Sequence, residues 1–554
     1  MRYLWPFLLL LSLTLGLAGC SPTPTATFHV PSSTPTATFQ VPSSTFTPAA
    51  MPTPTVAPNT PLPTPTWNLE PGTPTPTAMF QVPSSTFTPQ ATSTPTWNLK
   101  PGTPTATAVP PLPVLSREME IMKPVIAINP GHGGADPGAS HQDSTGKTDL
   151  VEKDLNLQVG RKLADLLEAD GYPVLLIRDD DYSLVTIASR DQITRTYNEG
   201  QARVDLANAS GAAVYVHLHF NSWTDKNLRG TSVYYADAGP LAAQNRKLAG
   251  FLHAGLLARL RESGYDPPDL GVLDDLTIGR SYGRLFALGG NTRLTRGLDM
   301  PTALGEPLFL SNEQEAALLK KDSTLQAVAQ GYYDGIVQYL KWAEAEGLLI
   351  SRHVSAAEIE RGRTGQRKLA LTFDAGADAQ ALPAILEALR ARHLRATFFL
   401  TGQFVRSFPD LVRRIVAEGH ELGNHSDTHP DLTTLPDRQV VAELARAEAA
   451  VMAVTSQTTR PWFRPPLGAR DERIRNLAAA MGYRTVYWTL DSTDWRAEVT
   501  AAIVRQRVRQ YASDGAIIVF HTSSQATAEA LPSLLDDLIA AGYRPVTLSE
   551  LLAN

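Results

Sequence analysis

Three ionisable residues in the first half of the chain have side chains of the types that hold a catalytic zinc ion. His132 follows an apolar stretch within Asn-Pro-Gly-His-Gly-Gly, Glu152 stands at the start of an amphipathic stretch, and His219 ends a second apolar stretch. Two imidazoles and one carboxylate leave one zinc coordination position open for water. Zinc lowers the pKa of that water toward neutrality, so that hydroxide can attack an amide carbonyl.

Glu306, within the segment MPTALGEPLFLSN, is the candidate proton carrier for the same chemistry. A carboxylate there could take the proton of the water and pass it to the leaving amine. His217 is an alternative to His219 as the metal ligand. Each residue also has an ordinary explanation: a turn histidine, a surface carboxylate or, for Glu152, a favourable charge at a helix N-terminus.

A second group of candidate residues lies in five short segments of the second half of the chain. The segments are TFDAG, GNHSDTHP, RPPLGARD, DSTDW and IIVFHT, and the residues are Asp374, His425, His429, Arg464, Asp491, Trp495 and His521. Two histidines four positions apart lie on one side of a helical turn, where both can face one metal ion. Taken alone, the histidines could be a loop pair, and Asp491 and Asp494 could be helix caps or solvated charges.

Alternating strands and helices are predicted to position the first group. PVIAINPGH, YPVLLIR and AVYVHLHFN are typical of buried strands, and DLNLQVGRKLADLLEADG is typical of an amphipathic helix that ends at glycine. This alternation predicts an α/β layer fold with its site at the carboxyl ends of the strands. We expect a helical stretch near 314–346 and a polar linker over 347–365.

A second α/β series begins near Lys368 and is predicted to position the second group. Its strands are KLALTFDAG, RATFFLTG, RTVYWTLD and AIIVFHT, and helices are expected over 381–392 and 410–418. Parallel strands separated by helices in this way favour a (β/α) barrel-like arrangement.

The N-terminal segment 1–20 is similar to a bacterial lipoprotein signal peptide. A positive charge at Arg2 precedes a short apolar run, and the only cysteine of the chain, Cys20, follows Leu-Ala-Gly. The run is too short for an ordinary membrane-spanning helix. The resemblance implies lipidation of Cys20 and an extracytoplasmic, membrane-anchored protein, and the alternative is an ordinary secretion signal. A single cysteine excludes an intramolecular disulfide.

Residues 21–112 are dominated by proline, threonine and serine and contain repeated Trp and Phe segments. Proline blocks the spread of helix and sheet, and apolar residues are too sparse to offset the entropy of ordering. We expect a disordered, extended stalk that reaches at most roughly 280 Å at about 3.1 Å per residue. The net charge of −6 and the absence of a long basic run argue against nucleic-acid binding.

The segments INPGHGGADPGA, EKDLNL, HLHFN and PTALGEPLFLSN, in this order, resemble the zinc-dependent N-acetylmuramoyl-L-alanine amidases. The resemblance covers roughly 124–342 and implies a three-layer domain with a central sheet flanked by helices. It also implies Zn²⁺ as the cofactor, with His132, Glu152 and His219 as its ligands and Glu306 as the catalytic carboxylate. Substrates of that family are the stem peptides and glycan strands of peptidoglycan.

The same resemblance assigns a role to Asn221 and shows departures from the family pattern, one of which is the segment SYGRLFALGGNTRLTRGL. His219 is preferred over His217 because the family has its ligand two residues before the asparagine, here Asn221, which we assign to the substrate pocket. Asn129 stands where the family usually has aspartate, and Leu308 stands where glycine is common.

The five segments of the second half resemble the polysaccharide deacetylases of the NodB-homology type (carbohydrate esterase family 4) over about 366–554. The resemblance implies an irregular (β/α) barrel and Zn²⁺ or another divalent metal as cofactor. It implies the following roles: Asp374 as general base, His425 and His429 as metal ligands, Arg464 as the residue that orients the base, His521 as general acid supported by Asp491, and Trp495 as part of the acetyl pocket.

Ala375 departs from this family pattern, because the family has a second, metal-binding aspartate at this position. Asp378 could supply the missing carboxylate, or it could be the N-cap of a helix that begins near 379. Alternatively, two histidines and water hold the metal more loosely, or the domain binds glycan without turnover.

The sequence therefore predicts a lipid-anchored peptidoglycan hydrolase with two activities, an amidase and an N-deacetylase. Two alternatives remain. In one, only the amidase works and the second domain binds the wall. In the other, the deacetylase acts on chitin-like or xylan-like polymers.

Overall fold

The computed structural model describes residues 122–185, 192–278, 288, 296–349, 354–376 and 378–553. The predicted leader with Cys20 and the predicted stalk lie outside these residues. Among the helices that are described, none is long and apolar enough to cross a membrane.

A six-stranded sheet forms the centre of the first domain, with the strand order β4-β1-β5-β8-β6-β7. The β6–β8 pair is antiparallel and the other pairs of this sheet are parallel, so β6 and β7 run opposite to the other four strands. The strands are β1 (Ile126–Pro130), β4 (Val174–Leu176), β5 (Val214–Leu218), β6 (Thr231–Tyr235), β7 (Asp269–Asp274) and β8 (Thr302–Glu306). A short hairpin of β2 (Ser140–Gln142) and β3 (Thr148–Val151) lies outside this sheet.

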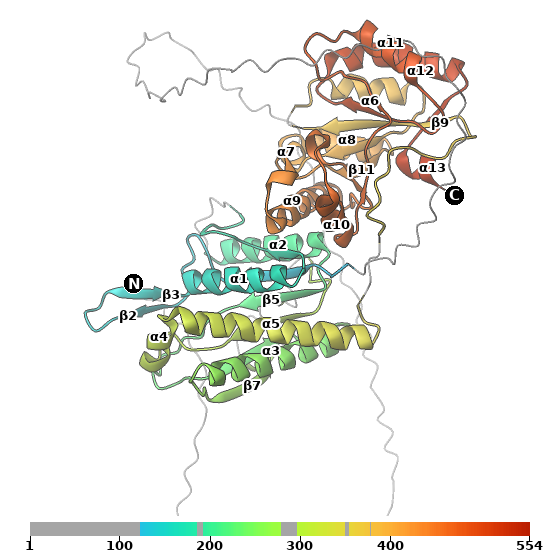
Figure 1. The fold of residues 1–554 in the computed structure, drawn as a ribbon. Helices are drawn as coiled ribbons and strands as arrows, with labels where there is room; N and C mark the ends of the chain where they lie inside the picture. Colours follow the sequence, from blue (N-terminus) through green and yellow to red (C-terminus); the bar gives the residue numbers. More distant parts are fainter. Residues whose placement is uncertain are drawn as a thin grey trace, which may run out of the picture. The chain divides into compact units, whose positions relative to one another are not determined.

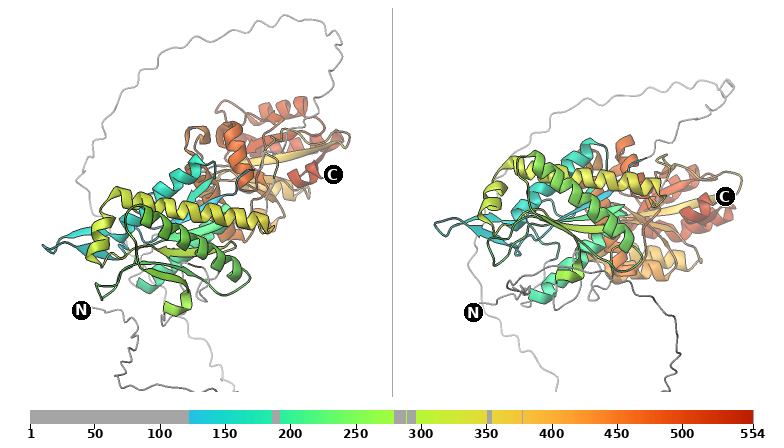
Figure 2. Two further views of the ribbon diagram at one scale, coloured as in Figure 1. Left: turned by 60° about the horizontal axis from the view of Figure 1, so that its bottom comes forward. Right: turned by 90° about the horizontal axis from the view of Figure 1, so that it is seen from below.

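Helices cover both faces of this sheet, which confirms the expected three-layer fold. α1 (Glu152–Ala169), α3 (Ala242–Glu262) and α5 (Asp322–Ala345) pack on one face, where α3 and α5 lie side by side in Figures 1 and 2. α2 (Gln192–Ser210) packs on the other face, where Leu206 and Ala207 contact the apolar side chains of β1 and β4. A 3-10 turn (Asp275–Ile278) follows β7, and α4 (Glu313–Leu319) precedes α5.

Continuous apolar runs explain why the central strands lie where they do. Ile126, Ala127 and Ile128 of β1 are fully buried, as are Val214 and Val216 of β5. Strands covered by helices on both faces are buried on both faces, so they lack the polar alternation of surface strands. Parallel pairing of β1, β5 and β8 brings the carboxyl ends of these strands to one edge of the sheet.

The second domain is built on a curved sheet of eight parallel strands. The order is β13-β12-β11-β10-β9-β15-β14, and β16 also pairs with β9. The strands are β9 (Lys368–Ala375), β10 (Thr397–Leu400), β11 (Glu421–Asn424), β12 (Trp462–Phe463), β13 (Arg484–Thr485), β14 (Leu490–Asp491), β15 (Ile517–His521) and β16 (Arg544–Val546).

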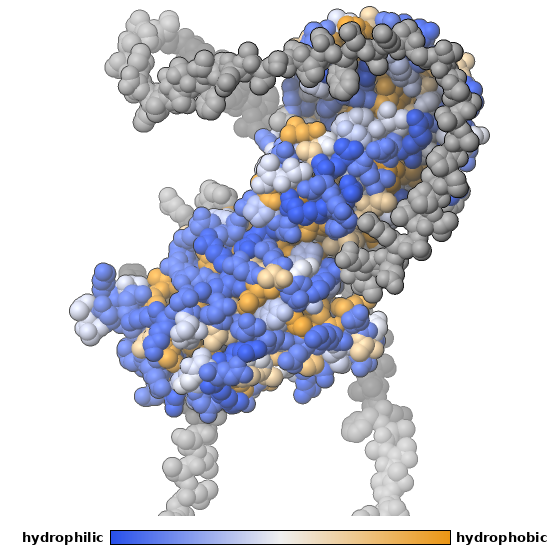
Figure 3. Space-filling view, in the orientation of Figure 1, coloured by the Kyte–Doolittle hydropathy of each residue, from blue (hydrophilic) through white to orange (hydrophobic). Residues whose placement is uncertain are grey.

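Helices surround this second sheet. α6 (Leu382–Arg390), α11 (Ala501–Tyr511) and α12 (Gln525–Ala540) pack together next to β9 and β15 (Figure 1). α9 (Asp437–Thr455) contacts α7 (Gly402–Ser407), α8 (Pro409–Ala417) and α10 (Glu472–Ala480), and α13 (Leu548–Leu552) ends the chain. Over the visible face, the described surface is mostly hydrophilic, as expected where the apolar side chains form cores (Figure 3).

Two expectations about elements need correction. The predicted strand RTVYWTLD is divided into β13 and β14, because Val486 forms only a single bridge, with Ile359, and residues 487–489 belong to no strand. The predicted helix near 314–346 is two helices, separated at Lys320 and Lys321. The expected irregular (β/α) barrel is confirmed, and its path of paired strands is open between β13 and β14, which makes it a half-barrel.

Candidate functional site

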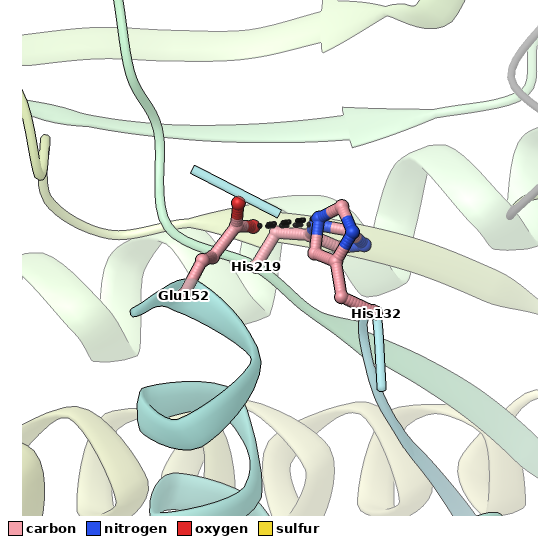
Figure 4. A group of neighbouring side chains, drawn as sticks. All are labelled: His132, Glu152 and His219. Carbon is pink, nitrogen blue, oxygen red and sulfur yellow. Dashed lines mark hydrogen bonds and ion pairs between the residues drawn. The ribbon is translucent and has the colours of Figure 1, made fainter. Parts of the chain in front are cut away.

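His132, Glu152 and His219 form one compact group at the sheet edge of the first domain. Glu152 Oε1 lies 3.1 Å from His132 Nε2 and 2.8 Å from His219 Nδ1. The three side chains point toward one another from the turn after β1, the first residue of α1 and the end of β5 (Figure 4). Of the residues that the structure describes, this is the single group of three or more such ligands whose donor atoms lie within 4.8 Å of one another.

Two glycines leave the space that this group needs. A Cβ atom on Gly131 would lie 2.3 Å from His219 Nε2, and a Cβ atom on Gly138 would lie 2.6 Å from Glu152 Oε2. Real Cβ atoms do not approach other atoms so closely, so any side chain at either position would displace a member of the group. The turn after β1 is therefore shaped around these three side chains.

The electrostatics of the group suit a metal ion. Burial opposes the charge on His132, but the carboxylates of Glu152 and Asp136 outweigh it and raise the pKa of His132 to about 10. Burial also opposes the charge on Glu152, yet the two histidines hold its pKa well below the ordinary range. Burial lowers the pKa of His219, which is therefore neutral. Two imidazoles and a buried carboxylate fit a divalent ion with an open position.

His217 lies beside this group and does not belong to it. Its ring stacks on that of His219 with 4.7 Å between centroids, because residues two apart on a strand face the same side. Burial lowers the pKa of His217, and its Nδ1 atom has no hydrogen-bond partner. The structure thus brings His219, and not His217, to the other candidate ligands.

Glu306 and Asn221 lie at the same sheet edge. Leu218 pairs with Gly305, so His219 and Glu306, the next residues of the two chain segments, are level with each other. The amide of His219 donates to the carbonyl of Gly305 at 3.1 Å. Asn221 exchanges backbone hydrogen bonds with the segment after Glu306, donating to Leu308 at 2.9 Å and accepting from the Leu310 amide at 2.7 Å.

Sequence reasoning missed three residues that contact this site from outside. Asp136 Oδ2 lies 2.8 Å from His132 Nδ1, and Arg178 and Arg203 donate to the backbone of the turn that carries His132. The local sequence contains one signal for these residues: the charged Arg178 directly follows the apolar segment VLLI, where a buried strand is expected.

The second domain gathers Asp374, Arg464 and His425. Arg464 is fully buried, and its Nη1 donates to Asp374 Oδ1 at 2.7 Å. Burial opposes the charge of Asp374, but Arg464 and then His425 outweigh it and hold the pKa of Asp374 below the ordinary range. Asp374 is therefore an ionised carboxylate that Arg464 holds in place.

His425 and His429 face each other, with 4.9 Å between ring centroids. Burial lowers the pKa of His425 to about 4, so the imidazole is neutral and can bind a metal ion. His425 Nε2 lies 3.8 Å from Asp374 Oδ2. Ala375 is fully buried in the apolar core, so this domain offers two imidazoles and, at a longer distance, one carboxylate.

The carboxylate that supports His521 is Asp494, which corrects the expected Asp491. His521 Nδ1 lies 2.7 Å from Asp494 Oδ1, and the His521 amide donates to Asp494 Oδ2 at 2.9 Å. Burial opposes the charge of His521, but Asp494 outweighs it and raises the pKa of His521. Asp491 instead accepts from the Thr493 amide, because the turn after β14 directs its side chain back to its own backbone.

Asp378 and Trp495 also differ from expectation. Asp378 is exposed, and its Oδ1 accepts from the Gln380 amide at 2.8 Å. It shapes a turn before α6, whose N-cap residue is Ala381. The Trp495 side chain is 58% exposed rather than part of a closed acetyl pocket.

Both halves of the chain are hydrolase domains by fold and by site, and comparison with known proteins gives their families. Residues 126–338 match the model of the N-acetylmuramoyl-L-alanine amidases, and residues 361–486 match that of the polysaccharide deacetylases. The chain belongs to the polysaccharide deacetylase family, carries a domain that matches the amidase family, and is a hydrolase of cell-wall remodelling.

The curated relatives are similar to the second domain. The peptidoglycan-N-acetylmuramic acid deacetylase PdaA of Bacillus subtilis is 35% identical over 199 residues, which are 34% of this chain and 73% of PdaA. The peptidoglycan-N-acetylglucosamine deacetylase PgdA of Listeria monocytogenes is 35% identical over 198 residues, 36% of this chain and 41% of PgdA. A chitooligosaccharide deacetylase of Bradyrhizobium is 32% identical over 34% of this chain and 92% of its own length.

Solved structures cover the same part of the chain. The structure of Bacillus subtilis PdaA is 32% identical, with a TM-score of 0.34, and covers 38% of this chain and 88% of that one. A wild-type CE4 family pseudoenzyme from Bacillus anthracis is 32% identical, with a TM-score of 0.35, and covers 36% of this chain and 70% of that one.

Proposed function

We propose that the first domain hydrolyses the amide bond between muramic acid and the L-alanine of the stem peptide. The observation that carries this proposal is the group of His132, Glu152 and His219 within a domain of the amidase family. We propose Zn²⁺ as the metal. Zinc, when bound by these three residues, polarises the amide carbonyl and lowers the pKa of a bound water.

The remaining residues of the first domain would move the proton and place the substrate. Glu306 is level with His219 on the neighbouring strand, which supports its role as the group that accepts a proton from water and donates it to the leaving amine. Asn221 joins the two strand ends through its backbone, which supports a place beside the substrate.

For the second domain, we propose N-deacetylation of an acetylated amino sugar of peptidoglycan. Asp374, held by Arg464, would take the proton of the attacking water, and His521, held by Asp494, would protonate the leaving amine. A divalent ion between His425 and His429 would polarise the acetamide carbonyl. Relatives named for peptidoglycan sugars support this substrate class.

We further propose that the lipidated Cys20 attaches the protein to the outer side of the membrane and that the stalk carries both domains into the wall. The leader pattern and the proline-rich composition support this arrangement. Metabolic labelling with a palmitate analogue tests it: Cys20→Ser should abolish the label and release the protein, and an unchanged label would contradict lipidation.

Digestion of purified sacculi followed by mass spectrometry tests both activities. We expect free stem peptides and deacetylated sugars from the wild type. Glu306→Gln should reduce the release of stem peptides about 10²- to 10⁴-fold, as for loss of a general acid–base group, without reducing deacetylation. Release of neither product by the wild type would contradict the proposed function.

Ala375 favours a second candidate function, in which the second domain binds glycan without turnover. The aspartate that the family uses as a metal ligand is replaced by a residue of the apolar core. Measurement of acetate release from peptidoglycan and from chitooligosaccharides by the full chain, beside Asp374→Asn, distinguishes the candidates. Equal release by both proteins would support the binding function, and release from chitooligosaccharides alone would change the substrate.

A further inference from the structure

Two buried arginines in the first domain contact the turn that carries His132 from behind. Arg178 and Arg203 lie on different elements, the first just after β4 and the second on α2. Arg178 has no exposed surface, and Arg203 is 6% exposed. Burial of a guanidinium group is costly unless its N–H groups find acceptors, so the contacts of these two side chains must account for their position.

Arg178 donates its hydrogen bonds to backbone carbonyls. Nε donates to Pro130 at 3.1 Å, Nη2 donates to Gly131 at 3.0 Å, and the same Nη2 donates to Lys153 at 2.7 Å. Gly131 precedes the ligand His132, and Lys153 follows the ligand Glu152. A single nitrogen atom of Arg178 thus joins the two chain segments that carry these ligands.

Arg203 holds the same turn from the other side. Nη2 donates to the carbonyl of His132 at 2.7 Å, and Nη1 donates to the carbonyl of Pro130 at 3.0 Å and to Asn129 Oδ1 at 2.8 Å. Glu199, at 2.8 Å, balances the charge of Arg203. Together the two guanidinium groups donate hydrogen bonds to three successive backbone carbonyls, those of residues 130–132.

The backbone at His132 needs this support. His132 has φ = +60°, in the left-handed region that a residue with a side chain rarely adopts. Such a conformation persists only where surrounding contacts enforce it. Among the residues that the structure describes, Arg178 donates only to backbone carbonyls and to no carboxylate, and burial followed by repulsion from Arg203 lowers the pKa of Arg178 to about 10. Two repelling cations are therefore held together at this turn.

We propose that Arg178 and Arg203 are positioning residues that order the metal-binding turn before metal arrives. The inference rests on the proposed function of the first domain. The planar fork of arginine donates along several directions at once, whereas lysine is a point donor on a flexible stem. Lysine at either position retains the charge and cannot bridge the same carbonyls.

Hydrogen exchange of the full-length wild type, with and without zinc, is the first test. The amides of Gly131, Gly133 and Lys153 all donate to backbone carbonyls and report on the turn and the start of α1. We expect these amides to be nearly as protected without zinc as with it. Protection that arises only on addition of zinc would overturn the proposal. Hydrogen exchange of the zinc-free protein does not depend on activity. Failure to bind zinc would contradict the proposed function of the first domain, and it would be seen separately from the protection of these amides.

Arg178→Lys and Arg203→Lys in the full chain are the second test. Competition with a chromophoric chelator should show zinc affinity reduced at least tenfold, with faster exchange at Gly131 in the zinc-free protein. Arg161→Lys is the matched control, because Arg161 also donates to a backbone carbonyl, that of Asp179, but is half exposed and contacts neither ligand segment. Wild-type zinc affinity in folded variants of both arginines would overturn the proposal.

Discussion

At the scale of single residues, the charge state of each site follows from its immediate neighbours. Glu152 and Asp136 make His132 hold a proton where an isolated histidine would lose it. Asp494 does the same for His521. For these two histidines, a neighbouring carboxylate therefore favours the protonated imidazole.

Zinc binding to the first domain should release protons. The pKa of His132 is raised to about 10, so at pH 7 this group is protonated and must lose its proton to become a ligand. Glu152 and His219 already have their metal-binding charge states, since both pKa values are lowered. Titration calorimetry in buffers of different ionisation enthalpy should show about one proton released, and acidification should weaken zinc binding. Zero release would contradict the assigned state of His132.

Asp494→Asn should shift the pH dependence of deacetylation. Because the pKa of His521 is raised, His521 keeps its proton at pH values above the ordinary histidine pKa near 6.5. The stability that the His521–Asp494 pair contributes is complete below about pH 6.5 and is lost as the pH rises through the raised pKa. Without the carboxylate, the pKa of His521 falls. As the pH is raised, acetate release should therefore begin to decline at a lower pH in the variant than in the wild type. Asp491→Asn is the control, and a larger shift from that variant would restore Asp491 as the partner.

At the scale of elements, strand ends and helix starts bring the site residues together. Parallel pairing places the residues after β1 and β5 and the last residue of β8 at one edge, and α1 begins there with Glu152. In the second domain α9 contributes in a different way. Glu443 is buried on α9 and accepts from the amides of Asp427 and Thr428, at 2.9 and 2.8 Å.

Glu443→Ala should loosen the loop that carries His425 and His429, the two candidate metal ligands of the second domain. Ser426 and His429 have φ of +66° and +64°, so this loop needs external contacts. Leaving the buried amide of Asp427 without its acceptor costs about 1–3 kcal/mol, and hydrogen exchange at Asp427 and Thr428 should accelerate. Glu443→Gln keeps an acceptor oxygen and should have a smaller effect. Equal exchange rates in the wild type and the alanine variant would contradict the role of Glu443 in holding this loop.

At the scale of the whole molecule, each domain gathers its own candidate catalytic groups on its own sheet. Among the described residues, the group of His132, Glu152 and His219 and the candidate residues of the second domain have no member in common. The chain thus combines an amidase domain and a deacetylase domain.

Variants of the full chain should separate the two activities. His132→Ala removes a candidate ligand of the first site, so the release of stem peptides from sacculi should fall below detection while acetate release continues. Asp374→Asn should have the opposite effect. Mass spectrometry of both products measures this, and the loss of both products in either variant would show that one activity supplies the substrate of the other.

The sequence by itself determined the α/β class, the positions of the central strands and the types of the ligands. Apolar runs bury strands wherever they occur, and glycine-rich turns at their ends leave room for a site. Only the tertiary structure decided that Asp494 rather than Asp491 supports His521, that Asp378 is a turn residue, and that Arg178 and Arg203 hold the turn of His132. The roles of Asp494, Arg178 and Arg203 depend on contacts between segments far apart in the chain, and that of Asp378 depends on the local backbone path, neither of which the sequence pattern specifies.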